Sequence, residues 1–240
     1  MTGLMIMKPP SFALRLLDAA GIALVYLYAR LWHRLTCHSY ARVPPQGPAI
    51  VISNHTCSAD PAFLTAACPR RLSFIVGIEY YRIPLLWRLF NYLECVPVTR
   101  NGRDAKAALV ALRRLRANQA LCIFPEGGLS NAGRHRLGRC KAGASFLALK
   151  SGAPVYPAYI SGGPQTSNIG RAWLWPSRVS VRFGPAIDLT AYAKQPMNRK
   201  LLEDVSRVLM RHVAALALPS TADHLTDASV NTRKPLGGTP

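Results

Sequence analysis

Short apolar runs alternate with helical patterns along most of this chain, and that alternation constrains its fold more than any other feature. The apolar, strand-like runs lie at 48–53, 71–77, 94–100, 120–127, 153–162 and 178–184. The helical patterns lie at 61–67, 104–119, 141–152 and 198–218. Strands that alternate with helices are typical of α/β domains, in which helices cover the faces of a sheet. We therefore expect an α/β fold with a mixed, mostly parallel sheet flanked by helices.

Composition divides the 240 residues into three regions. The alternating pattern begins after the Pro-rich segment VPPQGP, so we expect the folded domain to span 43–218. A chain of this length can build one α/β domain with a sizeable core, and two smaller domains remain an alternative. Residues 219–240 are rich in Ser, Thr, Asp and Pro without periodicity, and we expect them to form a disordered tail.

The N-terminal region, residues 1–42, contains a strongly apolar segment at 12–35. Its longest uncharged run, 19–29, is too short for a convincing transmembrane helix. On a helix, most of its polar side chains fall on one side, and the other side forms a wide apolar face. The polar side chains are Arg15, Asp18, Arg30, His33 and Arg34. This amphipathic pattern favours a helix that lies in a membrane interface. A helix packed against the core of its own domain would have a similar pattern and remains the alternative.

The chain is strongly basic, with 30 Lys and Arg against 11 Asp and Glu and a formal net charge of +19. Such an excess is not needed for folding and indicates attraction to an anionic partner: nucleic acid, a lipid surface or a phosphorylated substrate. The sequence contains no recognised nucleic-acid-binding motif, and its basic residues are scattered rather than gathered in one stripe. We expect an anionic membrane surface as the partner, and no nucleic acid.

The six cysteines form no C-x-x-C pair and show no zinc-site spacing, so we expect no metal site. Several of them lie in apolar runs, where a small buried thiol is the ordinary interpretation. A reducing compartment therefore fits the chain better than a disulfide framework.

The segment SNHTCSAD at 53–60 places His55 and Asp60 five positions apart, where a strand ends and a helix begins. A neutral imidazole can remove a proton from an alcohol, and a carboxylate on its other nitrogen orients the ring. No G-x-S-x-G motif accompanies the pair, so the alcohol is expected to belong to a substrate. The alternative is that His55 caps a loop and Asp60 caps a helix.

Two further segments follow strands that should end at the same edge of the sheet. FPEGG at 124–128 is a turn that places Glu126 at the edge where α/β folds bind ligands, although it could simply be a good turn. Arg100 ends the run CVPVTR, where its planar guanidinium could hold a phosphate or could simply be solvated.

The order of these blocks, followed by the apolar run Val155 to Pro157, resembles the glycerolipid acyltransferase family, whose best-known members acylate 1-acylglycerol-3-phosphate. The resemblance covers residues 48–162 and includes the motif N-H-x-x-x-x-D. It implies that His55 is the general base and that Asp60 orients it. It also implies an acceptor site with Asn54, Arg100, Glu126 and Gly127, and an acyl-donor side with Val155 and Pro157.

The FPEGG segment at 124–128 departs from the family pattern. The family commonly continues E-G-T-R-S, whereas this chain has Gly128 and Leu129 in place of the Thr and the Arg. The departure leaves the acceptor headgroup open. Arg134, Arg136 or Lys141 could supply the missing charge.

These observations together predict an O-acyltransferase of phospholipid biosynthesis or remodelling. It would move an acyl group from acyl-CoA or acyl carrier protein to a lysophospholipid hydroxyl, without a cofactor or a metal. We expect it on the cytoplasmic face of a membrane. The alternatives are a basic nucleic-acid-binding module and a lipid or thioester hydrolase that uses the same pair of residues on water.

Overall fold

The computed structural model describes residues 12–38, 43–99, 104–129, 137–138 and 140–217. Within these residues seven strands form one sheet in the order β1-β7-β6-β2-β5-β3-β4. Their bounds are β1 (Thr36–Cys37), β2 (Ala49–Ser53), β3 (Leu72–Gly77), β4 (Val96–Val98), β5 (Ala120–Ile123), β6 (Val155–Ser161) and β7 (Ser180–Phe183). Of the neighbouring strand pairs in this part of the chain, β6 and β7 are antiparallel and the others are parallel. The expected mixed, mostly parallel sheet is confirmed.

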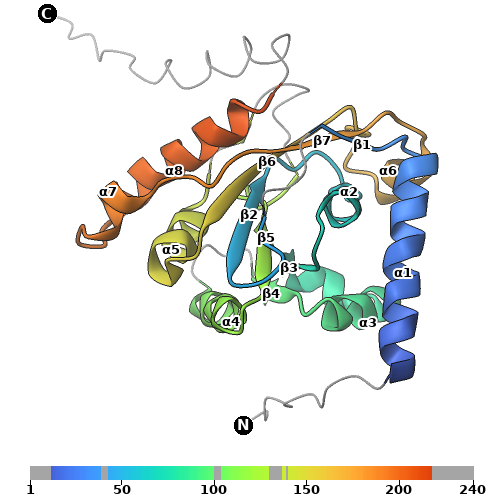
Figure 1. Cartoon of the computed structure of the whole chain (residues 1–240), viewed down its shortest axis with the longest axis horizontal. Coiled ribbons are helices and arrows are strands. Elements are labelled where there is room, and N and C mark those ends of the chain that lie inside the picture. The colour runs from blue at the N-terminus through green and yellow to red at the C-terminus, as the bar shows by residue number, and fades with distance from the viewer. Residues whose placement is uncertain (1–11, 39–42, 100–103, 130–136, 139, 218–240) are drawn as a thin grey trace, which may run out of the picture.

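Helices cover both faces of the sheet, and Figure 1 shows the two layers on either side of it. One face carries α4 (Ala105–Arg116), α5 (Ala142–Ser151) and α8 (Arg199–Ala214), and the other carries α1 (Phe12–Leu31), α2 (Asp60–Ala67) and α6 (Ile169–Leu174). The remaining helical segments are η1 (Ile78–Arg82), α3 (Pro84–Tyr92) and α7 (Thr190–Ala193).

The core lies in two apolar layers because successive side chains of a strand point to opposite faces. In β2, Val51 packs with the α1 and α2 layer, whereas Ile50 and Ile52 pack with the α4, α5 and α8 layer. All five residues of β2 are buried. This central strand therefore has a fixed register, and the segment that follows it leaves the sheet at a defined place.

Local signals in the sequence set several helix ends. The Asp104 side chain accepts a hydrogen bond from Ala107 N at 2.9 Å at the start of α4, as expected of an N-cap. Hydrogen bonds from the backbone of Thr99 and of Ala107 lower the pKa of Asp104 to about 2. At the end of α5, Gly152 has a φ of +64°, a left-handed conformation that favours glycine.

The N-terminal segment forms the helix α1, one side of which packs against α2. Ala29 is buried in that contact, whereas Leu31 on another side is 70% exposed. None of the helices in the described ranges is long and apolar enough to cross a membrane. The expected tail at 219–240 lies outside the described residues.

Several elements differ from the expectations drawn from sequence. The predicted strand at 94–100 is shorter, because β4 pairs with β3 only from Val96 to Val98. The helix α6 and the two-residue strand β1 were not predicted, because both are too short to show a hydrophobic period.

Candidate active site

The segment between β2 and α2 folds back so that His55 meets Asp60. His55 Nδ1 lies 2.9 Å from Asp60 Oδ2. The Asp60 side chain is fully buried, and the His55 side chain is 16% exposed. Since Nδ1 donates to the carboxylate, Nε2 carries the free electron pair. Nε2 makes no hydrogen bond to the described residues.

The carboxylate of Asp60 also holds the loop that carries His55. Its Oδ2 accepts hydrogen bonds from Thr56 N at 2.5 Å and from Cys57 N at 2.9 Å. Its Oδ1 accepts from Thr56 Oγ1 at 3.2 Å and from Cys57 Sγ at 3.3 Å. These donors fix the orientation of the carboxylate, and the carboxylate in turn fixes the orientation of the imidazole.

Phe124, at the end of β5, supports the other side of the imidazole. The two rings are stacked, with centroids 4.0 Å apart and an angle of 15° between their planes. Phe74 of β3 stacks on Phe124 in turn, at 6.3 Å. Three neighbouring strands, β2, β5 and β3, therefore position the His55 imidazole at the carboxyl edge of the sheet.

Glu126 lies in the turn after β5 and bridges two segments through its carboxylate. Its Oε1 accepts a hydrogen bond from His55 N at 3.1 Å, and its Oε2 accepts one from Gly138 N at 2.7 Å. The structure thus brings the FPEGG turn against the SNHTCSAD segment, and Glu126 holds the backbone of the His55 loop. Its predicted contact with the acceptor stays a prediction.

Gly127 and Lys141 lie together beside Glu126. Gly127 has a φ of +70°, a left-handed conformation that favours glycine. Lys141 Nζ lies 3.4 Å from Gly127 O, and Lys141 N donates to Pro125 O at 2.8 Å. The Lys141 ammonium therefore places a positive charge at this edge of the sheet. Arg100, Arg134 and Arg136 lie outside the described residues.

The other predicted residues have positions inside the sheet. Asn54 is buried and ties β2 to β6, because Nδ2 donates to Ile160 O at 2.8 Å and Oδ1 accepts from Ile160 N at 2.7 Å. Val155 and Pro157 are buried residues of β6, opposite Ile50 and Ile52 of β2. The structure therefore places them in the core rather than at the edge that carries His55, and their predicted link to the acyl donor stays a prediction.

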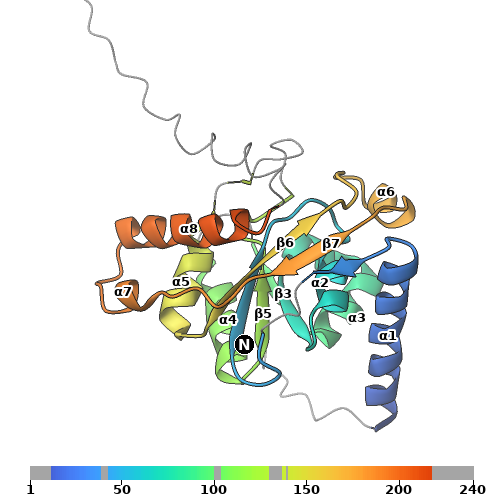
Figure 2. The same ribbon diagram turned by 45° about the horizontal axis from the view of Figure 1, so that its top comes forward.

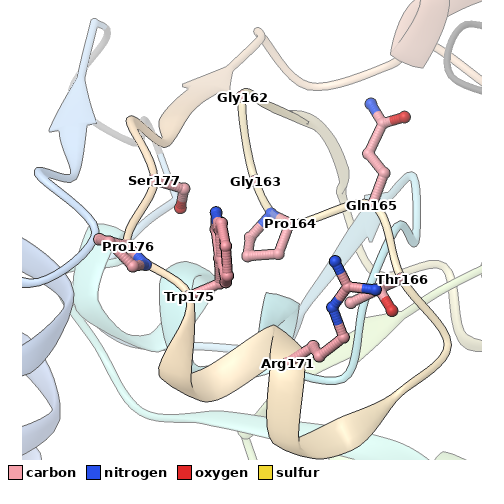
Figure 3. Close-up of a pocket in the computed structure, with 9 residues that line it drawn as sticks. All are labelled: Gly162, Gly163, Pro164, Gln165, Thr166, Arg171, Trp175, Pro176 and Ser177. Atoms are coloured by element: carbon pink, nitrogen blue, oxygen red, sulfur yellow. The ribbon is translucent and has the colours of Figure 1, made fainter.

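A pocket of about 420 Å³ adjoins the His55 loop and was not predicted from the sequence. Its lining comes from the connection between β6 and β7 and is shown in Figure 3: Gly162, Gly163, Pro164, Gln165, Thr166, Arg171, Trp175, Pro176 and Ser177. Thr166 forms a parallel β-bridge with Cys57, and a Cβ added at Gly163 would lie 3.8 Å from Thr56 Oγ1. The connection that lines the pocket thus contacts the His55 loop at Cys57 and lies close to it at Thr56.

Within the described part of the chain, no group of three or more His, Cys, Asp or Glu side chains is placed to hold a metal ion. All six cysteines belong to that part, and none of them forms a disulfide.

The sequence and the fold both match known acyltransferases. Residues 34–161 match the family model described as Acyltransferase. The probable 1-acyl-sn-glycerol-3-phosphate acyltransferase of Mycoplasma pneumoniae is 30% identical over 49% of this chain and 46% of its own length. The 1-acyl-sn-glycerol-3-phosphate acyltransferase of Borreliella burgdorferi is 31% identical over 49% of this chain and 47% of its own length. The chain thus spans about half the length of the curated relatives it matches.

A solved structure shares the fold. The crystal structure of the 1-acyl-sn-glycerophosphate acyltransferase of Thermotoga maritima superposes with a TM-score of 0.65 at 18% identity, over 95% of this chain and 86% of that one. The family match covers the segment that contains the His55–Asp60 pair, the Glu126 turn and most of the sheet. The chain belongs to the Acyltransferase family.

Proposed function

We propose that this protein is an O-acyltransferase that moves a fatty acyl group from an acyl thioester to the hydroxyl of a lysophospholipid. The observation that carries the proposal is the 2.9 Å contact between His55 Nδ1 and the buried Asp60, at the sheet edge of an acyltransferase-family domain. The donor is acyl-CoA or acyl carrier protein, and 1-acylglycerol-3-phosphate is the acceptor that the names of the relatives suggest.

The proposed reaction uses the free nitrogen of His55 as a general base. The acceptor oxygen attacks the thioester carbonyl carbon while Nε2 takes the hydroxyl proton. The tetrahedral intermediate then collapses, the C–S bond breaks, and the proton passes from Nε2 to the leaving thiolate. The products are an ester and a free thiol. Asp60 stabilises the imidazolium that exists between these two proton transfers.

Cys57 is the cysteine nearest to His55 in sequence, and its geometry argues against a covalent acyl-enzyme through this thiol. Its side chain is buried, and its Sγ points to Asp60 Oδ1 at 3.3 Å. Burial, followed by the nearby charge of Asp60, raises the pKa of the thiol above its usual value. The group therefore stays a thiol at neutral pH, which is a weak nucleophile.

We expect Cys57→Ala to keep kcat within about tenfold of the wild type, because it removes only one of the donors that hold Asp60. The steady-state rate of thiol release with a lysolipid acceptor measures this. A loss of about 10⁴-fold or more, as expected when a nucleophile is removed, would instead support an acyl-enzyme. Thermal unfolding of the variant separates a catalytic effect from a loss of fold.

The direct test of the function is incubation of the full chain with labelled acyl-CoA and a panel of lysolipids, with products read by mass spectrometry. We expect a diacyl product from at least one lysolipid, and thiol release that depends on that lysolipid. Thiol release at the same rate without any lysolipid would show a hydrolase. The panel should include lysophosphatidic acid and neutral-headgroup lysolipids, because Gly128 and Leu129 replace the Thr and Arg of the family pattern.

The proposed acceptor has one acyl chain and has to be taken from a membrane. We propose that the protein works on the cytoplasmic face of an anionic membrane, to which its net charge of +19 attracts it. At the acceptor site, the ammonium of Lys141 beside Gly127 supplies positive charge for a phosphate headgroup.

A further inference from the structure

Helix α1 carries an apolar stripe on the side that faces α6. Residues 24, 27, 28 and 31 are spaced as i, i+3, i+4 and i+7, so their side chains share one side of the helix. Tyr28 of this stripe contacts α6 through Trp173, and the two rings stack with centroids 5.7 Å apart. The three leucines beside it stay between 51% and 70% exposed: Leu24, Leu27 and Leu31.

The end of α6 adds two exposed apolar residues close to this stripe. Leu174 is 75% exposed and Trp175 is 64% exposed, directly after the Trp173 that stacks on Tyr28. Figures 1 and 2 both show α6 beside the C-terminal end of α1. We call Leu24, Leu27, Leu31, Leu174 and Trp175 the α1–α6 apolar face.

A buried hydrogen-bonded cluster braces the two halves of this face. The Tyr28 hydroxyl donates to Trp173 O, and it lies 2.8 Å from His33 Nε2. His33 Nδ1 lies 2.6 Å from Ser177 Oγ, and His33 O accepts from Val179 N at 3.0 Å. Burial lowers the pKa of His33, so the ring is neutral at neutral pH and Nδ1 can accept from Ser177. The end of α1 and the α6 segment therefore form one rigid unit.

Basic residues lie in the two segments that carry the face. Segments 19–38 and 161–187 contain no Asp or Glu. Four exposed arginines lie in them: Arg30, Arg34, Arg171 and Arg178. Exposed Leu and Trp side chains next to arginines are typical of surfaces that lie in the headgroup region of an anionic membrane.

We infer that the α1–α6 apolar face is a membrane-docking surface, in which the end of α6 inserts beside α1 as a second, braced contact. A second copy of this chain is a less favourable occupant, because self-association would bring the same arginines together without an acidic counterpart. An anionic lipid surface complements both the apolar side chains and the positive charge.

The role of this docking rests on the proposed function, because an acyltransferase that uses lysolipids has to reach them in a membrane. Arg171 and Trp175 belong both to the α6 segment and to the lining of the pocket in Figure 3. That pocket touches the His55 loop through the bridge between Thr166 and Cys57. Docking through the end of α6 would therefore bring this pocket to the bilayer surface, on the connection that contacts the His55 loop.

The test is vesicle binding by the full chain, which does not depend on enzymatic activity. We expect the variant Leu174→Ser/Trp175→Ser to need at least about tenfold more lipid for half-maximal binding to phosphatidylcholine–phosphatidylglycerol vesicles, because two apolar side chains no longer insert. Leu109→Ser is the matched control, since Leu109 is an exposed leucine of α4 on the opposite face of the sheet. We expect this control to bind like the wild type.

Bromine-labelled lipids give an independent readout, because they quench tryptophans that lie at the depth of the acyl chains. We expect Trp175→Phe to bind vesicles normally and to lose a large part of the quenching. Equal vesicle binding by the wild type and Leu174→Ser/Trp175→Ser would overturn the inference. A second outcome would also overturn the inference: Leu174→Ser/Trp175→Ser changes the mass of the protein in solution, measured by light scattering, but does not change its vesicle binding.

The single variant Leu174→Ser separates docking from catalysis, because Leu174 does not line the pocket. With a water-soluble short-chain acceptor it should transfer acyl groups at the wild-type rate, since no membrane is involved. If the wild type itself transfers no acyl group, the proposed function fails, while the vesicle result still decides the docking surface.

Discussion

His55→Ala is expected to lower kcat by about 10²–10⁴-fold, the usual contribution of a general base. The KM for the acceptor should change little, because Nε2 acts on the hydroxyl proton and not on the headgroup. The variant should also fold, since the imidazole is a partly exposed group at the edge of the core. Steady-state kinetics with acyl-CoA and a lysolipid, together with circular dichroism, measure these effects.

The matched control is His212→Ala. His212 is an exposed histidine of α8, on the other side of the sheet, with its Nδ1 2.9 Å from Val208 O. It should leave kcat unchanged. If His55→Ala kept kcat within a few-fold of the wild type with every lysolipid tested, His55 would not be the general base.

Asp60→Asn is expected to lower kcat by a similar factor and also to destabilise the protein. The amide has no charge with which to stabilise the imidazolium, so the proton transfer loses its support. The single carbonyl oxygen also replaces two carboxylate oxygens that together accept from His55, Thr56 and Cys57. We expect a loss of about 1–3 kcal/mol in the free energy of unfolding, because buried donors lose a charged acceptor. Urea unfolding measures it.

A double variant distinguishes a positioning role of Asp60 from a general structural effect. If Asp60 acts through the ring, the kcat of His55→Ala/Asp60→Asn should equal that of His55→Ala alone. Losses that multiply would show that Asp60 contributes independently. Asp188→Asn is the control for kinetics, because Asp188 is an exposed carboxylate that accepts from Thr190 N before α7.

The candidate site followed from the sequence in part. The spacing of His55 and Asp60 at a predicted strand–helix junction indicated that a turn could bring them together, and the structure forms that turn. The role of Glu126 as a support for the His55 backbone could not be predicted. That contact joins residues 71 positions apart, and it depends on β5 lying next to β2 in the sheet. Strand order is decided by the packing of the whole domain and not by any local pattern.

Fold class and most element positions could be predicted from the amino-acid sequence, because hydrophobic period and helix caps are local properties of the chain. The packing of the N-terminal helix could not be predicted in this way. Its pattern favoured a membrane interface, with a protein core as the alternative, and the structure gives one side to α2 and leaves the leucines beside α6 exposed. The brace between Tyr28 and Trp173 likewise exists only after folding, because it joins residues 145 positions apart.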